Sequence, residues 1–310
     1  MRPESADRRS GLLIALAGFA LLSAGDGLIK SIDGAWPGTA VAALRYFFGA
    51  AGLGALLWLS EGRAGFRLTR GWAHLGRGVA VAVATITFFM AIFLMPLAEA
   101  TAIQFTNPML TALLSAMLLG ERASRTAIAA TLVAFAGVLV VLRPNVAALG
   151  WAAVLPLIAA FGMAVLMILN RRVAGSGSVL AMQFWVAAFA CPVLIVATAL
   201  GHVSGIGWLA IGWPDAAIVL RCALVAVSAS VAHLLIYLAT TRASAAVIAP
   251  AVYIQLIVAI AIGVAFYGDI PDLISLGGSA IIVAAGLWLW RNEGRPAIVK
   301  HGGNAMEGRT

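Results

Sequence analysis

Charged residues are scarce in this chain. They make up 10% of the 310 residues, whereas hydrophobic residues make up 63%. Ordinary globular domains are about 25% charged and about 45–50% apolar. This composition excludes a soluble domain with a normal surface. The connections between apolar segments are also short, which excludes an independent extramembrane catalytic or DNA-binding module.

Metal ligands, disulfide pairs and nucleotide-binding motifs are also lacking. The two cysteines, Cys191 and Cys222, fall inside apolar segments, and no His cluster has ligand spacing. No Lys-Ser/Thr pair follows a glycine-rich stretch, as a phosphate loop requires. We therefore predict no metal and no cofactor. The polar groups within apolar segments are dispersed, which argues against a membrane-embedded enzyme.

Long apolar runs dominate what is present. A helix needs about 20 apolar residues to cross the hydrocarbon core of a membrane. Ten segments meet this length, and together they predict an all-α integral membrane protein. They are about 11–31, 37–60, 74–95, 98–119, 125–143, 149–170, 178–200, 215–238, 244–267 and 273–291.

The net charge of +8 is explained by topology. If the amino terminus is cytoplasmic, ten spans place both termini and most of the 20 Lys and Arg residues inside, which is the positive-inside bias. A nucleic-acid partner is not expected, and the lipid bilayer is. We predict a multi-pass protein of a bacterial-type inner membrane. The run after Arg8-Arg9 continues through Asp26 to Lys30, which favours an uncleaved first helix over a signal peptide.

The second half of the chain repeats the first. Gly120-Glu121 and Arg143 recur at the same separation as Gly268-Asp269 and Arg291. Each half holds five spans, and five is odd, so the second copy enters the bilayer from the opposite side. Inverted repeats are typical of secondary transporters. We predict a cytoplasmic segment 1–10, five-helix repeats 11–143 and 149–291, and a cytoplasmic tail 292–310.

Short motifs recur in both halves: Ala98-Glu99-Ala100-Thr101-Ala102, Asn107-Pro108, Leu118-Leu119-Gly120-Glu121-Arg122 and Leu142-Arg143-Pro144, then Ala243-Ser244-Ala245-Ala246, Ala249-Pro250, Tyr253 and Gly268-Asp269. In these residues the chain resembles the EamA-type family of the drug/metabolite transporter superfamily. The resemblance implies ten helices in two inverted repeats, with helices 1–4 and 6–9 around a central cavity and helices 5 and 10 outside it. One departure is Asp269, where the family pattern has Glu.

Charges inside spans are costly and tend to be paired or functional. Asp26 is a candidate for contact with a substrate or a proton, and the alternative is an ion pair with Lys30 one turn away. Arg45 lies about eight residues after Pro37, where the predicted helix begins. At 1.5 Å per residue this places Arg45 about 12 Å below the outer face of the membrane. It is expected either to hold a substrate carboxylate or to form a fixed ion pair with Asp26 or Glu99.

The predicted helix 98–119 carries a polar stripe. Gln104, Asn107, Thr111 and Ser115 recur every three or four residues, and Pro108 leaves the carbonyl of Gln104 without its helical donor. We interpret the stripe as cavity lining, and the alternative is helix packing through small polar groups. Glu99 starts this helix on another face, where the helix dipole also favours an acid.

Three further spans supply the remaining candidate site residues. Tyr253 and Gln255 lie in the region that corresponds to Asn107-Pro108, and Trp185 is a lining or packing aromatic. His233 is a candidate proton carrier, because its free pKa lies near physiological pH. The alternative for each is an ordinary buried side chain.

The sequence therefore predicts a secondary active transporter that exports a small polar or amphipathic, amino-acid-like metabolite by alternating access. Proton coupling would use Asp26, Glu99 or His233. The alternatives are an importer of a vitamin- or nucleoside-like compound and a lipid-carrier flippase. A homodimer through the fifth and tenth helices is permitted by Ala134, Gly137, Gly277 and Gly278. Substrate, direction, coupling ion and oligomeric state stay open.

Overall fold

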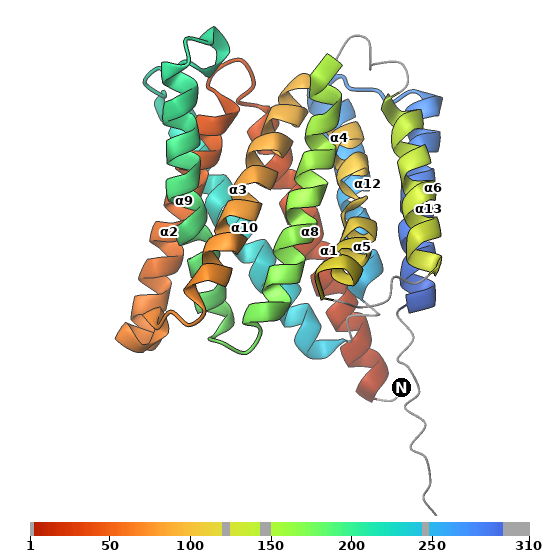
Figure 1. Ribbon diagram of the computed structural model, residues 1–310, viewed down its shortest axis with the longest axis horizontal. Coiled ribbons are helices and arrows are strands. Elements are labelled where there is room, and N and C mark those ends of the chain that lie inside the picture. Colours follow the sequence, from red (N-terminus) through yellow and green to blue (C-terminus); the bar gives the residue numbers. More distant parts are fainter. Residues whose placement is uncertain (1–2, 120–124, 143–149, 244–247, 294–310) are drawn as a thin grey trace, which may run out of the picture.

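A computed structural model describes residues 3–119, 125–142, 150–243 and 248–293 as a bundle of helices (Figure 1). The repeat markers Gly120, Glu121 and Arg143 lie outside these ranges, as do residues 144–149 and 294–310. The helices are α1 (Pro3–Lys30), α2 (Gly38–Glu61), η1 (Gly62–Phe66), α3 (Gly71–Leu94), α4 (Leu97–Gln104), α5 (Asn107–Leu119), α6 (Arg125–Leu142), η2 (Gly150–Val154), α8 (Leu155–Val173), α9 (Val179–Val203), η3 (Gly207–Leu209), α10 (Ala216–Arg242), η4 (Ala249–Tyr253), α12 (Ile254–Ile262), η5 (Gly263–Tyr267) and α13 (Leu273–Glu293).

Nine helices in the described ranges are long and apolar enough to cross a membrane. They match nine of the ten expected segments. The remaining segment, 98–119, is broken into α4 and α5 at Phe105 and Thr106. Pro108 has no backbone N–H to donate to the carbonyl of Gln104, so a continuous helix would lack a bond there. The sequence predicted one unbonded carbonyl, and the structure shows a complete interruption.

Local sequence explains where several helices begin. The Ser178 hydroxyl accepts a hydrogen bond from the Ala181 N–H at 3.0 Å, and the Asp215 carboxylate accepts one from Ile218 at 2.8 Å. Asp272 accepts from the N–H of Ser275 in the same way at 2.6 Å, at the start of α13. Such caps satisfy N–H groups that the first helical turn leaves without partners.

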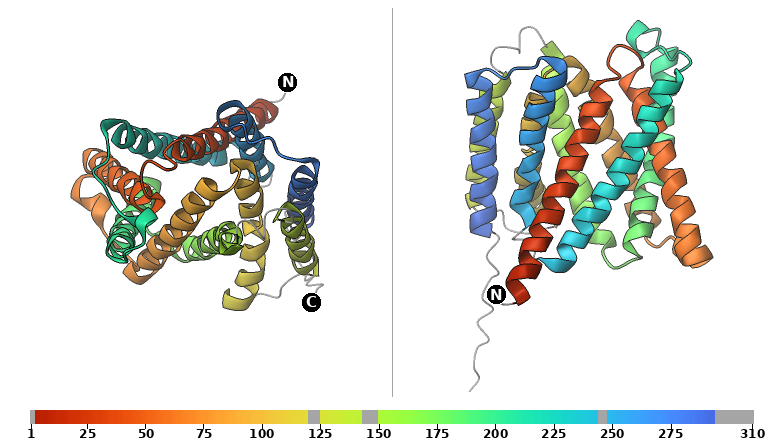
Figure 2. Two further views of the ribbon diagram at one scale, coloured as in Figure 1. Left: turned by 90° about the horizontal axis from the view of Figure 1, so that it is seen from above. Right: turned by 180° about the vertical axis from the view of Figure 1, so that it is seen from behind.

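The helices pack in pairs that join the two halves of the chain. Helix α1 packs on α10, α2 on α9, α3 on α8 and α4 on α12. Helices α6 and α13 pack on each other at one side of the bundle (Figure 2). The first four pairs surround the middle of the bundle, and α6 and α13 stand outside it.

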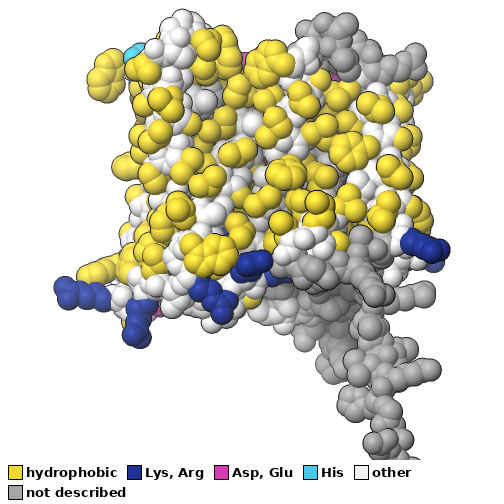
Figure 3. Space-filling view, in the orientation of Figure 1, with side chains coloured by type: hydrophobic (Ala, Val, Ile, Leu, Met, Phe, Trp, Pro, Cys, Tyr) yellow, Lys and Arg dark blue, Asp and Glu magenta, His cyan; other side chains and the backbone are white. Residues whose placement is uncertain are grey.

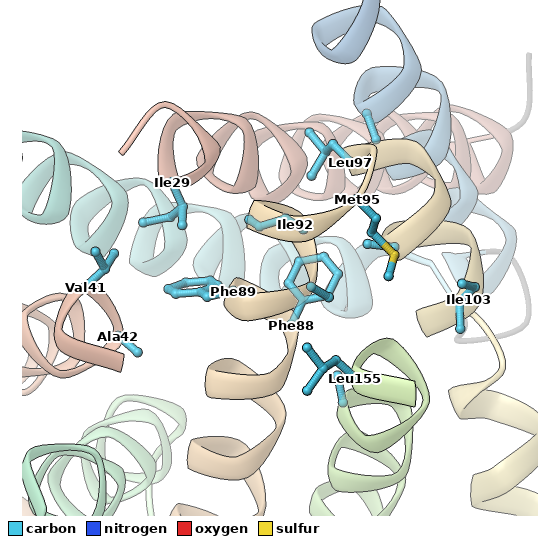
Figure 4. Close-up of a cluster of buried hydrophobic side chains, with 14 of the residues drawn as sticks. Ile29, Val41, Ala42, Phe88, Phe89, Ile92, Met95, Leu97, Ile103 and Leu155 are labelled. Carbon is cyan, nitrogen blue, oxygen red and sulfur yellow. The ribbon is translucent and has the colours of Figure 1, made fainter. Parts of the chain in front are cut away.

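The two ends of the bundle differ in character. At the basic end, Lys and Arg side chains gather along the lower edge in Figure 3. Exposed arginines at or next to the ends of helices include Arg63, Arg67, Arg171, Arg172 and Arg242. The opposite end is filled by apolar side chains. Ile29, Val41, Phe89, Ile92 and Leu155 come from α1, α2, α3 and α8 and are buried together (Figure 4). We call these five residues the apolar plug.

Close glycine contact holds α6 against α13. A Cβ atom on Gly278 would lie 2.8 Å from the Gly137 carbonyl oxygen and 2.7 Å from a Val141 methyl group. Gly137 and Gly278 therefore pack within one chain, and they do not form a free surface for a second copy. Gly277 has nothing within 4 Å of such a Cβ atom.

We expect Gly278→Ala to destabilise the protein by about 1–3 kcal/mol, because an added methyl group must push two backbones apart. The neighbouring Gly277→Ala is the matched control, and we expect it to leave stability unchanged or slightly raised. The midpoint of thermal unfolding in detergent measures both. Equal midpoints for the two variants would contradict the close packing of α6 and α13.

Candidate functional site

A cavity of about 620 Å³ lies between helices of the two halves. Its walls come from α1, α2, α3, α4, α8, α9, α10 and α12, and they mix apolar with polar side chains. Five of the sequence-predicted site residues line it, namely Asp26, Arg45, Gln104, His233 and Gln255. A mainly apolar cavity that carries a few polar side chains is the arrangement expected of a solute-binding site.

Arg45 and Asp26 lie in the part of the cavity nearer the apolar plug. The Arg45 guanidinium lies 5.0 Å from the centre of the Tyr46 ring and 5.7 Å from that of Phe89, which are cation–π distances. Arg45 is close enough to Asp26 to interact electrostatically. Within the described residues, however, neither side chain forms an ion pair or a hydrogen bond. The fixed pair of Arg45 with Asp26 or Glu99, considered from the sequence, is not formed.

Tyr46 and Phe89 shape this part of the cavity. The Tyr46 hydroxyl hydrogen-bonds the Thr85 hydroxyl at 3.2 Å, which joins α2 to α3. Phe88 and Phe89 line the cavity and are also buried in the core, at 5% and 2% exposure. They therefore separate the cavity from the opposite end of the bundle. Tyr46 and Thr85 were not predicted, because a single Tyr or Thr in an apolar helix has no distinctive spacing.

The cavity continues to the basic end, where Arg77 and Asn170 line it. The Arg77 Nε–H donates to the Asn170 Oδ1 at 2.6 Å, across the contact of α3 with α8. Its Nη1 lies 3.0 Å from Nδ1 of His74. Arg77 was not among the site residues predicted from the sequence. Its position inside a long apolar helix is the indication that was available.

His233 and Gln255 complete the predicted lining. The His233 Nδ1 lies 2.7 Å from the Ala229 carbonyl oxygen, which only accepts, so Nδ1 carries the proton. The neutral ring then has Nε2 available as an acceptor. The Ser23 hydroxyl donates to the Gln255 carbonyl oxygen at 2.9 Å, which fixes α1 against α12 beside the cavity.

Asn107 and Thr111 of the predicted polar stripe do not line this cavity. The Thr111 hydroxyl donates to the Asn107 carbonyl oxygen at 2.8 Å, within α5. Ser115 is buried, and its hydroxyl has no partner in the described part of the chain. Of the four stripe residues, only Gln104, which lies before the break, lines the cavity. The stripe was predicted for one continuous helix, and its residues do not form a single face once that helix is broken.

Tyr253, Trp185 and Glu99 also lie outside the cavity lining. The Tyr253 ring meets Phe105 edge to face at 5.2 Å, and its hydroxyl sits against Gly286. Trp185 packs on Phe184, with ring centres 5.0 Å apart. The Glu99 carboxylate accepts a hydrogen bond from the Ser275 hydroxyl at 2.9 Å, at the contact of α4 with α13. In this conformation Tyr253 and Glu99 contact α13, and none of the three lines the cavity.

Lys30 is paired with Asp269 and not with Asp26. The Lys30 Nζ lies 2.8 Å from the Asp269 Oδ2 and donates to the Met95 carbonyl oxygen at 2.9 Å. Nearby, the Tyr267 hydroxyl donates to the Gly27 carbonyl oxygen at 2.6 Å. The Lys30–Asp269 and Tyr267–Gly27 contacts join the two halves at the end opposite the basic end, beyond the apolar plug. We call the Lys30–Asp269 pair, with its Met95 contact, the outer latch.

Comparison with known proteins also indicates a transporter. Residues 9–143 match the EamA-like transporter family. The riboflavin transporter of Rhizobium johnstonii is 28% identical over 84% of this chain and 83% of its own length. The S-adenosylmethionine uptake transporter of Rickettsia felis is 24% identical over 84% and 85%. The pseudopaline exporter CntI of Pseudomonas aeruginosa is 26% identical over 92% and 97%.

A crystal structure of a protein that is 22% identical aligns with a TM-score of 0.60 over 92% of this chain and 98% of that one, which supports the fold alone. The named relatives are transporters and not enzymes, and they span nearly the same length as this chain. Its apolar helices, the match of residues 9–143 to the EamA-like transporter family and its likeness to these relatives support a multi-pass membrane transporter, as the sequence predicted.

Proposed function

We propose that this transporter exports a small polar or amphipathic, amino-acid-like metabolite by alternating access through the cavity. The observation that carries the proposal is a cavity of about 620 Å³ with Asp26 and Arg45 at its deep part. A carboxylate and a guanidinium without hydrogen bonds of their own suit a solute that bears both an amine and an acid.

The proposed topology is ten spans in two inverted repeats, with both termini cytoplasmic in a bacterial-type inner membrane. Segment 97–119 is the fourth span, crossing as the broken pair α4 and α5. The helix pairs support the repeat, because α1 with α10 and α3 with α8 are the same pair exchanged between halves. Exposed arginines at one end support a cytoplasmic basic end (Figure 3).

The proposed energy source is an ion gradient, with the proton as coupling ion. Asp26 and His233 line the cavity and are titratable, so they are the carriers proposed. Glu99 was a third candidate, but its position against Ser275 favours a packing role.

Import in the same fold is a second candidate. It is favoured by the relatives from Rickettsia, which are uptake transporters, whereas the relative from Pseudomonas is an exporter. A vitamin- or nucleoside-like solute would then be the substrate proposed.

A comparison of metabolites inside and outside cells tests the proposal. The cells carry the native protein, an Arg45→Ala variant at equal abundance, or no protein. We expect a compound that accumulates in the medium only with the native protein. A compound drawn into the cells would establish import. Identical profiles in all three cultures would refute transport of a cellular metabolite and favour a lipid-carrier flippase.

A further inference from the structure

Arg77 is a buried cation on the wall of the cavity. Its residue exposure is 5%, yet it contributes to the cavity lining. A guanidinium has five N–H donors. Two are used, by Asn170 and by His74, and the other three have no partner in the part of the chain that the structure describes.

The two partners of Arg77 fix its position without neutralising its charge. Asn170 accepts through a neutral amide oxygen, and His74 accepts through Nδ1, which requires the neutral ring. No carboxylate in the described residues pairs with this guanidinium. A buried charge without a counter-ion is strongly unfavourable, so a retained one indicates a ligand of opposite charge.

Arg45 and Arg77 lie at two levels of one cavity. Thr85 bonds Tyr46, the neighbour of Arg45. Arg77 precedes Thr85 by eight residues on α3, which is about 12 Å along the helix axis. Asp26 is the one acidic side chain among the described lining residues, against two arginines. The cavity therefore carries excess positive charge along its length.

We infer that Arg77 is an anion-binding residue of the transport path and that the transported solute carries an acidic group, a carboxylate or a phosphate. The inference rests on the proposed function and deepens it, because it assigns a second binding residue to the acidic group of the solute. The acidic group meets Arg77 near the basic end, where three N–H groups suffice for a two-point contact. It then reaches Arg45 beneath the apolar plug. Asn170 and His74 act as positioning residues that hold the Arg77 fork toward the cavity.

Transport by purified protein in liposomes tests the inference. The liposomes hold a small-molecule extract of bacterial cells, and mass spectrometry follows which solutes cross. We expect the protein-dependent solutes to carry a carboxylate or phosphate. We expect Arg77→Gln to raise the half-saturating concentration of those acids at least about tenfold, which corresponds to the loss of one charged hydrogen-bond contact. Arg77→Lys keeps the charge but loses the fork, so an intermediate value is expected.

Arg67→Gln is the matched control, because it removes the same charge from an exposed site at the same end and outside the cavity. Asn170→Ala is a second variant that keeps the Arg77 charge and loosens its position; we expect a raised half-saturating concentration with a maintained maximal rate. Gel filtration and tryptophan fluorescence establish that each variant is folded.

The outcomes separate this inference from the proposed function. If the native protein moves only solutes that lack an acidic group, or if folded Arg77→Gln moves acids with native half-saturation, the anion-binding role is wrong while transport stands. A purely structural role for Arg77 would lower the maximal rate for every solute alike and would also overturn the inference. If the native protein moves nothing from the extract, the proposed function fails and this inference fails with it.

Discussion

Replacing Arg45 with glutamine is expected to slow transport of an acidic solute about 10-fold to 100-fold, the range for one lost hydrogen bond to a charged group. The Arg45 guanidinium lies on the cavity wall against Tyr46 and Phe89 and makes no hydrogen bond to the described residues. Its N–H groups are therefore available to a solute. The measurement is the initial rate in liposomes, at solute concentrations below half-saturation.

Two controls separate the role of Arg45 as a binding group from its packing. Arg45→Lys keeps the charge, so we expect it to lose less activity than the glutamine variant. Arg63→Gln removes an exposed charge at the basic end, and no change is expected. A native rate for a folded Arg45→Gln protein would show that the solute does not use this guanidinium.

Covalent closure of the outer latch is expected to abolish transport completely. Lys30 and Asp269 are 10% and 22% exposed in their side chains and join α1 to the turn after η5. With the apolar plug, they close the end opposite the basic end. Alternating access requires this end to open once in each cycle. A Lys30→Cys/Asp269→Cys protein, bridged by a short cleavable thiol reagent, should show only the leak of empty liposomes, and cleavage should restore transport.

The control for the latch experiment is each single-cysteine protein treated with the same reagent. The native Cys191 and Cys222 are buried and are replaced by alanine in every variant. The single-cysteine proteins should keep their untreated rates. Undiminished transport by the fully bridged double variant would mean that the latch does not separate during the cycle, and the outer end would then have to open elsewhere.

Much of the fold was predictable because each span is determined by local composition. Nine of the predicted apolar segments correspond to candidate membrane helices. The largest differences are that α1 begins at Pro3, where residue 11 was expected, and that the described part of 244–267 comprises η4, α12 and η5. The tenth was predicted as a continuous helix, and the structure breaks it between Gln104 and Asn107. Pro108 was recognised in the sequence. How far it interrupts the helix, however, depends on the groups that pack around the backbone at this point.

The candidate site was predictable only in part. Helical spacing places Asn107 and Thr111 on one face, but it does not say which element that face meets. Asp26 and Arg45 line the cavity, whereas Glu99 and Tyr253 pack against α13. Whether these positions bind a solute stays a prediction that the experiments above address.

The sequence by itself determined that the chain enters a membrane, where its apolar helices run and at which end its arginines gather, because these properties depend on neighbouring residues along the chain. The tertiary structure decided which polar groups share the cavity. Arg77 and Asn170 are brought together by the packing of α3 on α8, and Lys30 and Asp269 by that of α1 on the second half. These partners are far apart in the sequence, and only the pairing of helices between the halves makes them neighbours.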